Sequence, residues 1–311
     1  MNATVFKAAL AIFFAELFNA LNVNAQKFLL PDWSSPFAML LLRAAFGMFF
    51  FWVLSFFVRQ EKVSPKDLLF MLSAGALSLT AYMTFYLLGV EKSSPVDSSL
   101  IMSAMPITVL IFAFLFFKEK LSLLKITGMV LGMVGTVLII LIQEKKGPDV
   151  HTHNSVMGNI FCLFSAVSYG FYLIVNKRLA GKYNGLTMLK WIFTGAFVFS
   201  IPLILIFGWD ARIFTAGIEW EPLSVFAFVM IFPTGLTYLL IPYALKKLQA
   251  TTVAMFDYEV PIVASVVGIS IGQARFGWYQ PVAAALIFTG VYLVSRENSR
   301  LKKQNKDSLT I

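Results

Sequence analysis

The sequence predicts an all-α polytopic membrane protein in which ten transmembrane helices form two inverted five-helix repeats. Three observations lead to this prediction: a very apolar composition, ten long apolar runs, and a pattern that recurs 150 to 155 residues later. Of the 311 residues, 59% are apolar and 13% are charged, and the mean hydropathy is +0.78. Soluble domains average about 45–50% apolar and about 25% charged residues. The composition therefore excludes a soluble enzyme, a soluble nucleic-acid-binding protein and a disordered chain.

Ten apolar runs are each close to the length of about 20 residues that a helix needs to cross a bilayer. The first run is too long for a cleaved signal peptide and contains Glu16, Asn19 and Asn22, so we expect it to remain in the protein. The runs cover residues 7–28, 36–58, 67–89, 96–117, 123–142, 157–177, 186–207, 222–245, 251–272 and 278–295.

The basic residues indicate the orientation of these runs. Of the 25 Lys and Arg residues, 17 fall in the segments on the N-terminal side of the membrane and 6 on the other side, while Arg43 and Lys190 lie within runs. Cytoplasmic loops carry an excess of Lys and Arg. We therefore expect both termini in the cytoplasm, in a bacterial inner (plasma) membrane. This bias also explains the net charge of +9 without a nucleic-acid partner.

One pattern of residues occurs twice. A linker of small residues leads into a helix with a central proline, then a short turn and a glycine-rich helix follow. Pro106 and Pro261 are 155 residues apart, and so are Gly135 and Gly290. Each copy contains five runs, and an odd number makes the second copy start on the opposite side of the membrane. Inverted repeats of this kind are typical of alternating-access transporters, whose substrate site lies between the halves near the midplane.

The expected organisation has four parts. They are a first five-helix repeat at 5–142, an extracytoplasmic loop at 143–156, a second five-helix repeat at 157–295 and a cytoplasmic tail at 296–311.

The repeated order of elements resembles the EamA-type members of the drug/metabolite transporter superfamily. The resemblance covers roughly 5–295 and is most specific at 88–140 and 243–295. It implies a carrier of small metabolites that commonly exports amino acids or related compounds. It also implies that the first, third, fourth, sixth, eighth and ninth helices surround a central cavity. One departure is that the acidic turn residue of the family, present as Glu119, is Gln273 in the second copy.

Polar side chains form matching stripes on two of the runs. The first run carries Asn19 and Asn22 at helical spacing, and the sixth carries Tyr169, Tyr172 and Asn176. An offset of 150 residues places 19 on 169 and 22 on 172. We expect both faces to line the central cavity and to bind substrate. The alternative is hydrogen bonding between helices, which such residues commonly provide in membranes.

Further candidate substrate-binding residues lie on the third, fourth and eighth runs. Tyr82, Tyr86 and Tyr238 offer apolar rings, hydroxyl groups and π-faces that suit amphiphilic solutes. Met102 and Met105 form an adaptable face on the fourth run. Aromatic core packing is the alternative for each tyrosine.

Ionisable residues within the runs are few. Each costs about 2.5–3.5 kcal/mol on insertion scales and usually faces protein or a water-filled cavity. Glu16 and Asp257 are the candidates for proton coupling. Glu259 lies about 200° around the helix from Asp257, so both cannot face one cavity, and we favour Asp257. Arg43 either pairs with a buried carboxylate, attracts an anionic solute or snorkels to the headgroups. Lys190 is expected to snorkel.

The pattern as a whole predicts a secondary transporter that works by alternating access on a small-molecule substrate. No P-loop or other nucleotide motif is present, so we expect a gradient to supply the energy, with the proton as the candidate coupling ion. A passive channel is the alternative, and a membrane scaffold or an intramembrane enzyme has less support. We expect no cofactor and no metal, because His151 and His153 lack further ligands. The Gly128-x-x-x-Gly132 motif predicts close helix packing or a homodimer contact.

Overall fold

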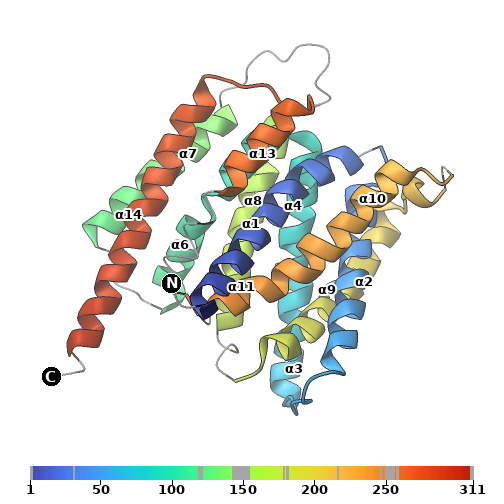
Figure 1. Ribbon diagram of the computed structural model, residues 1–311, viewed down its shortest axis with the longest axis horizontal. Coiled ribbons are helices and arrows are strands. Elements are labelled where there is room, and N and C mark those ends of the chain that lie inside the picture. Colours follow the sequence, from blue (N-terminus) through green and yellow to red (C-terminus); the bar gives the residue numbers. More distant parts are fainter. Residues whose placement is uncertain are drawn as a thin grey trace.

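Every described element of the computed structural model is helical (Figure 1). The structure describes residues 3–30, 32–117, 122–141, 155–177, 179, 182–215, 217–245, 247–248, 256 and 259–308.

Six helical stretches of this described part are long and apolar enough to cross a membrane. Four are single helices and two are built from three consecutive pieces. The single helices are α1 (Ala3–Leu29), α2 (Pro36–Ser55), α8 (Ser155–Lys177) and α9 (Gly185–Phe207); the composite ones are α3 (Pro65–Ser73), η1 (Ala74–Leu79) and α4 (Thr80–Lys92), and α10 (Trp220–Val229), η3 (Met230–Leu236) and α11 (Thr237–Leu245). The other elements are α5 (Pro95–Met102), α6 (Met105–Phe117), α7 (Leu123–Leu141), η2 (Arg212–Phe214), α13 (Glu259–Ser270) and α14 (Tyr279–Ser308).

Each of the ten runs expected from the sequence contains helix. In the expected tail at 296–311, α14 continues as a helix to Ser308. Most of the expected loop, residues 143–154, lies outside the described residues. The start of α1 and the end of α14 lie toward the same side of the molecule (Figure 1).

Three helices begin at the same short motif, a serine followed by proline. Pro36, Pro65 and Pro95 each occupy the first turn, where the missing N–H costs no hydrogen bond. The hydroxyl of the preceding serine accepts a hydrogen bond from a backbone N–H three residues on, at 3.1–3.3 Å. This cap satisfies a donor that the first helical turn leaves unpaired.

In each expected repeat, one π-helical segment interrupts the third run. These segments are η1 and η3, which begin at Ala74 and Met230, 156 residues apart. In each case a threonine hydroxyl donates to a carbonyl oxygen five residues earlier, Thr80 to Gly75 at 3.0 Å and Thr234 to Val229 at 2.9 Å. π-Helical turns are rare and are frequently found at functional sites.

The fourth run is broken near its middle. Helix α5 ends at Met102 and α6 begins at Met105, with a turn at Ser103 and Ala104 between them. Pro106 follows this turn and has no N–H to donate, which accounts for the break at this place. Discontinuous helices of this kind expose backbone polar groups inside a membrane protein.

Two pairs of helices lie at opposite ends of the molecule, α7 against α14 and α2 against α9 (Figure 1). Between them α1 packs against α13 and α11, and α4 packs against α8. The α7–α14 contact is close: a Cβ atom at Gly290 would lie 2.4 Å from the carbonyl oxygen of Gly128 and 2.7 Å from the amide nitrogen of Gly132. The Gly128-x-x-x-Gly132 surface therefore serves packing within the chain.

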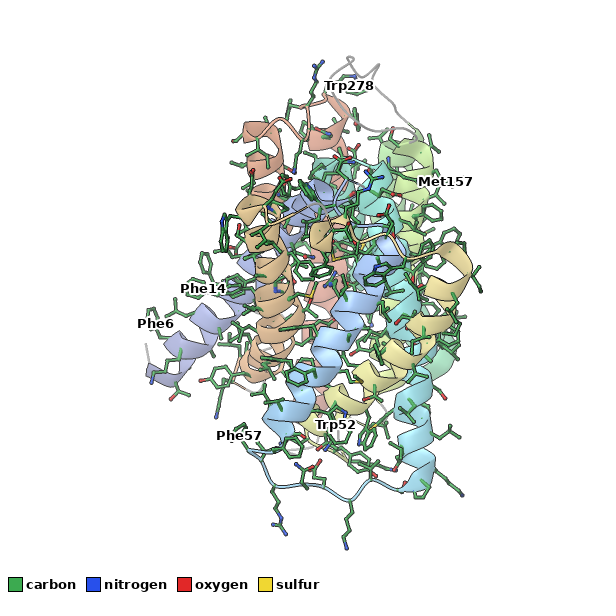
Figure 2. All side chains as sticks on the ribbon, turned by 90° about the vertical axis from the view of Figure 1, so that its right-hand side faces the viewer. Phe6, Phe14, Trp52, Phe57, Met157 and Trp278 are labelled. Atoms are coloured by element: carbon green, nitrogen blue, oxygen red, sulfur yellow. The ribbon has the colours of Figure 1, made fainter. Side chains whose placement is uncertain are left out.

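Large apolar side chains cover the outside of the molecule. Phe6, Phe14, Phe57, Met157 and Trp278 project from different parts of its surface (Figure 2) and are 42–82% exposed. Extensive exposed apolar surface marks contact with lipid or with another protein. Together with the long apolar helices, this surface identifies a polytopic membrane protein.

Candidate functional site

Five tyrosines, which we call the tyrosine cluster, come together between α4, α8 and α11. The rings of Tyr82 on α4 and Tyr169 on α8 are 4.8 Å apart between centroids. Tyr86 and Tyr172 extend the cluster along the same two helices, at 6.2 Å from Tyr82 and 5.7 Å from Tyr169. Tyr238 on α11 lies within electrostatic range of Tyr82, Tyr169 and Tyr172. All five residues were expected at the site from the sequence.

Two phenylalanines support the cluster from α2 and α9. The ring of Tyr238 meets Phe193 edge-on at 5.2 Å between centroids and Phe51 at 6.4 Å. Both phenylalanines are fully buried. No pattern in the sequence pointed to them, because 32 phenylalanines are spread over the apolar runs.

Helix α1 brings a chain of amides to the cluster. The Asn22 side-chain amide donates to the Tyr86 hydroxyl at 3.0 Å, and the Gln26 amide donates to the Asn22 carbonyl oxygen at 3.4 Å. Asn22 and Gln26 are both buried. Asn19 is turned to its own helix instead, where it donates to the Glu16 carboxylate at 3.1 Å. The expected stripe on α1 is therefore divided between a contact with α4 and a contact within α1.

The remaining uncharged candidates, Met102, Met105 and Asn176, are not part of the tyrosine cluster. Met102, at the end of α5, is half-buried and packs against the apolar core that contains the tyrosines. Met105, the first residue of α6, is also half-buried, and the turn at 103–104 separates it from Met102. Asn176 lies in the last turn of α8, where the structure describes the backbone alone.

Arg43 extends from the middle of α2 toward the tyrosine cluster. Only 4% of it is exposed, and its Nε donates to the Thr234 hydroxyl of η3 at 3.0 Å. The guanidinium lies within electrostatic range of Tyr82, Tyr86 and Tyr238. Thr234 was missed by the sequence reasoning, since a single threonine in an apolar run carries no signal of its own.

Two of the expected carboxylates lie near each other. Glu16 on α1 is 5% exposed and lies within electrostatic range of Glu259 on α13 and of Tyr82. Asp257 lies outside the described residues, so the preference for Asp257 over Glu259 stays a prediction. Glu16 is thus near both Glu259 of α13 and Tyr82 of the tyrosine cluster.

The sequence reasoning missed one buried carboxylate, Asp97 on α5. It is 2% exposed and accepts hydrogen bonds from the Gln280 amide at 3.1 Å and from the Tyr279 hydroxyl at 3.3 Å, both on α14. Asp97 was taken as part of a linker because it stands at the start of a run. Its position in the first turn after the Ser94 cap was the signal that could have found it.

Lys190 lies in the second turn of α9. Its Nζ donates to the Gln60 side-chain oxygen at 2.7 Å and lies 4.7 Å from the ring centroid of Trp52 and 5.9 Å from that of Trp191. The expectation that it snorkels fits this position, because the ammonium group reaches the polar segment beyond the end of α2.

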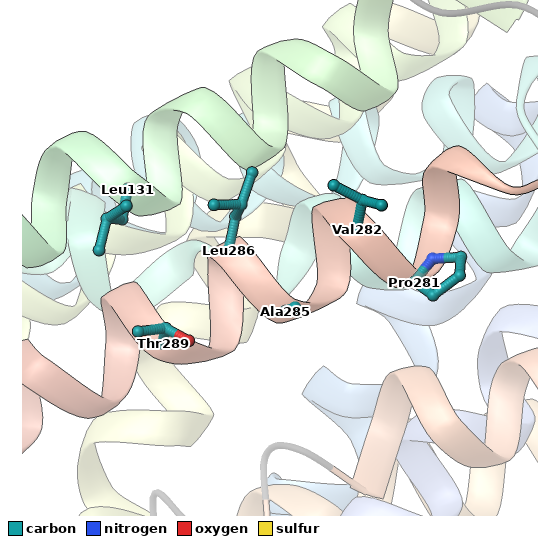
Figure 3. Close-up of a pocket in the computed structure, with 6 residues that line it drawn as sticks. All are labelled: Leu131, Pro281, Val282, Ala285, Leu286 and Thr289. Carbon is teal, nitrogen blue, oxygen red and sulfur yellow. The ribbon is translucent and has the colours of Figure 1, made fainter.

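A groove of about 450 Å³ lies on the outside of the α7–α14 pair (Figure 3). It is lined by Leu131 of α7 and by five residues of α14, among them Pro281, Leu286 and Thr289. The lining is almost wholly apolar, and the groove is open to the surroundings, as expected of a surface that contacts lipid. It is separate from the tyrosine cluster, which draws on α4, α8 and α11.

The fold and the placement of its polar groups define a class: a polytopic membrane protein whose aromatic and charged side chains gather in its interior. Comparisons with known proteins give the family. The profile of the EamA-like transporter family matches residues 6–141 and again residues 156–296. The chain belongs to the EamA-like transporter family and is a multi-pass membrane transporter.

Several curated relatives agree with this assignment. An uncharacterized transporter of Archaeoglobus fulgidus is 25% identical over 85% of this chain and 90% of that protein. The uncharacterized transporter YcxC of Bacillus subtilis is 26% identical over 78% of this chain and 77% of its own length. A WAT1-related protein of Arabidopsis thaliana is 23% identical over 92% of this chain and 90% of its own length.

One solved crystal structure shares the fold. It aligns with a TM-score of 0.62 and 18% sequence identity, and covers 93% of this chain and 98% of its own. At this identity the likeness concerns the fold alone.

Proposed function

We propose that the protein is a secondary transporter that exports a small polar or amphiphilic metabolite, such as an amino acid or a related compound, by alternating access. The tyrosine cluster, together with Asn22 and Arg43, would hold the substrate. Residues 5–142 and 157–295 would form two inverted five-helix halves that rock about this site. Both termini would lie in the cytoplasm and the protein in a bacterial inner (plasma) membrane.

The observation that carries the proposal is the origin of the cluster. Tyr82 and Tyr86 come from the segment of the first family match, and Tyr169, Tyr172 and Tyr238 from that of the second. A site shared by both halves changes its exposure when the halves move relative to each other. This is the requirement for alternating access at a fixed central site.

The irregular segments support the same mechanism. The π-helical turns η1 and η3 occur at corresponding places of the two matched segments, and α5 is separated from α6 by a turn. Such places have fewer regular backbone hydrogen bonds to break when a helix bends. The excess of basic residues beside the termini, on one side of the membrane, supports the orientation.

Proton coupling would use Glu16 and a carboxylate of the ninth run. Glu16 lies within electrostatic range of Glu259, and Asp257 is two residues away in the chain. Two carboxylates close together in a low-dielectric interior cannot both ionise easily. One of them would therefore carry a proton that substrate binding can release.

The transport proposal is tested in proteoliposomes with a panel of radiolabelled amino acids and related metabolites. We expect saturable uptake and counterflow for at least one of them, lost in Tyr82→Ala and Tyr169→Ala. Tyr292→Ala is the matched control, since that tyrosine of α14 is 54% exposed. Conductance without saturation or counterflow would identify a channel instead. Uptake that is equal in all three variants would remove the tyrosine cluster from the mechanism.

The coupling proposal has a separate test. We expect uptake to depend on an imposed pH gradient in the wild-type protein and to lose that dependence in Glu16→Gln, while counterflow remains. Glu219→Gln is the control, because Glu219 is an exposed residue before α10. Uptake that ignores the pH gradient, or that keeps its dependence in Glu16→Gln, would contradict coupling through this residue.

A further inference from the structure

Among the residues that the structure describes, Arg43 has no charged partner. It is 96% buried in the middle of α2, and its Nε donates a hydrogen bond to Thr234. Within the part of the chain that the structure describes, no carboxylate lies within 4.0 Å of the guanidinium. A guanidinium has five N–H donors and no acceptor. Toward the described residues, most of its hydrogen-bonding capacity is therefore unused.

Among the described residues, the groups near Arg43 are neutral. They are Tyr82 and Tyr86 of α4, Tyr238 of α11 and Thr234 of η3. Glu16 has electrostatic partners in Asn19 and Glu259, and Arg43 is not among them. The tyrosines near the cation supply no formal charge.

Snorkelling does not account for this placement. A snorkelling arginine extends its head group to the water or the headgroups while its stem stays in the apolar region. The guanidinium of Arg43 instead turns inward, to the Thr234 hydroxyl of η3, and lies within electrostatic range of the tyrosine cluster. An unpaired buried charge is costly and usually marks a functional group in a membrane protein.

We propose that Arg43 binds a carboxylate group of the transported solute, and that the tyrosine cluster holds the aromatic or aliphatic remainder. The inference rests on the proposed transport function and adds the substrate class to it. Thr234 fixes Nε, so the two Nη atoms are left to bind both carboxylate oxygens end-on. Arginine suits this task because its planar fork matches the geometry of an oxyanion.

The placement of Thr234 gives the inference a second support. Its hydroxyl donates to the Val229 carbonyl oxygen and accepts from Arg43, so the hydroxyl is satisfied in both roles. The π-helical turn η3 brings this threonine to α2 across a distance of 191 residues in the chain. Thr234 is thus a positioning residue, which holds the guanidinium in one orientation before a solute arrives.

The test compares carboxylic acids with their primary amides. Purified wild-type protein is screened by thermal shift and by isothermal titration against matched acid–amide pairs on several aromatic and aliphatic scaffolds, with phosphate esters of the same scaffolds alongside. We expect acids to bind more tightly than their amides by about tenfold or more, as expected for a hydrogen-bonded ion pair. Arg43→Gln should remove this preference, and Arg43→Lys should restore part of it.

Lys190→Gln provides the matched control, because it removes a different buried cation and should leave the preference for acids intact. Asp257→Asn tests whether a carboxylate of the chain occupies Arg43 instead. If the wild-type protein binds no acid and the Asp257→Asn variant does, Asp257 pairs with Arg43 in the resting protein and the inference is wrong.

The remaining outcomes separate this inference from the transport proposal. Amides that bind as well as acids, or phosphate esters that bind better than acids, would overturn the carboxylate assignment. Neutral or cationic solutes that bind in a Tyr82-dependent way, with no acid doing so, would overturn it too and leave the transport proposal standing. A panel in which no compound of any charge binds would overturn both.

Discussion

Two buried cations of this protein have opposite surroundings. Lys190, near the start of α9, is surrounded by groups that compensate its charge: the Gln60 oxygen at 2.7 Å, the faces of two tryptophans and the nearby Glu61. Arg43, in the middle of α2, has one hydroxyl acceptor and a ring of neutral tyrosines. Both residues are 4% exposed, so burial alone does not distinguish them.

On our proposal, this difference separates a structural charge from a functional one. A cation that is stabilised by acceptors, aromatic faces and a nearby carboxylate contributes to the stability of the resting protein, and its removal should cost stability. A buried cation without a counter-ion raises the free energy of the resting protein, and a bound anionic ligand would offset that cost. Natural proteins keep such costly groups where activity depends on them.

The largest effect is expected for Arg43→Met. Transport of an acidic solute should fall by about tenfold or more, since the ion pair with the solute is lost. The free energy of unfolding should rise by about 2 kcal/mol, because a buried charge without a counter-ion is removed. Uptake in proteoliposomes and chemical denaturation in detergent measure the two effects. A loss of stability together with a loss of transport would make Arg43 a structural residue like Lys190.

The next effect concerns the contact between the two helices that carry these cations. A Cβ atom at Gly47 would lie 2.2 Å from Cδ1 of the Phe193 ring, which is fully buried between α2 and α9. Gly47→Ala should therefore lower the free energy of unfolding by about 1–3 kcal/mol, as overpacking does. Gly185→Ala, which meets no atom within 4 Å, is the control and should be neutral or slightly stabilising. Equal behaviour of the two variants in denaturation would contradict the close α2–α9 contact.

Lys190→Met should change the free energy of unfolding less than Arg43→Met does, and in the opposite direction. The variant loses a hydrogen bond to Gln60 and two cation–π contacts, so the free energy of unfolding should fall by about 1 kcal/mol. Transport should stay within about twofold of the wild-type rate, since no tyrosine of the cluster is near Lys190. Stabilisation by this substitution would show that the two cations do not differ in the way described.

The smallest effect is expected for Thr234→Ala. Without the hydroxyl, Nε of Arg43 loses its acceptor, and affinity for an acidic solute should fall by about threefold, the worth of one ordinary hydrogen bond. Thr234→Ser keeps the hydroxyl and should bind as the wild-type protein does. Titration of the best acid from the panel measures both variants, and a Thr234→Ser protein as weak as Thr234→Ala would argue against positioning.

The fold class could be predicted because it depends on bulk properties. Sparse charge and long apolar runs leave a helical membrane protein as the one solution in which all backbone groups are satisfied. The tyrosines could be predicted as well, because helical spacing puts Tyr82 and Tyr86 on one face of α4 and Tyr169 and Tyr172 on one face of α8. Both faces were expected to line one central cavity, and the rings of Tyr82 and Tyr169 lie 4.8 Å apart between centroids.

Other features depend on contacts distant in the chain and left no local signal. The partner of Arg43 is 191 residues away, and the π-helical turns that place it are set by packing against neighbouring helices. Asn19 illustrates the same limit, since spacing put it on the cavity face but it bonds with Glu16 one turn below. Asp97 was taken as part of the linker that leads into a run, because apolar runs do not say which of their end residues are buried by another helix.

The glycine contact between α7 and α14 has a mechanical consequence. Backbone lies directly on backbone where Gly290 meets Gly128, so no flexible side chain can adjust if one helix slides along the other. These last helices of the two matched segments should therefore keep their contact when the protein changes conformation. If the halves rock as proposed, we expect the smallest displacement at the α7–α14 pair and the largest at the opposite end of the molecule, where α2 carries Arg43.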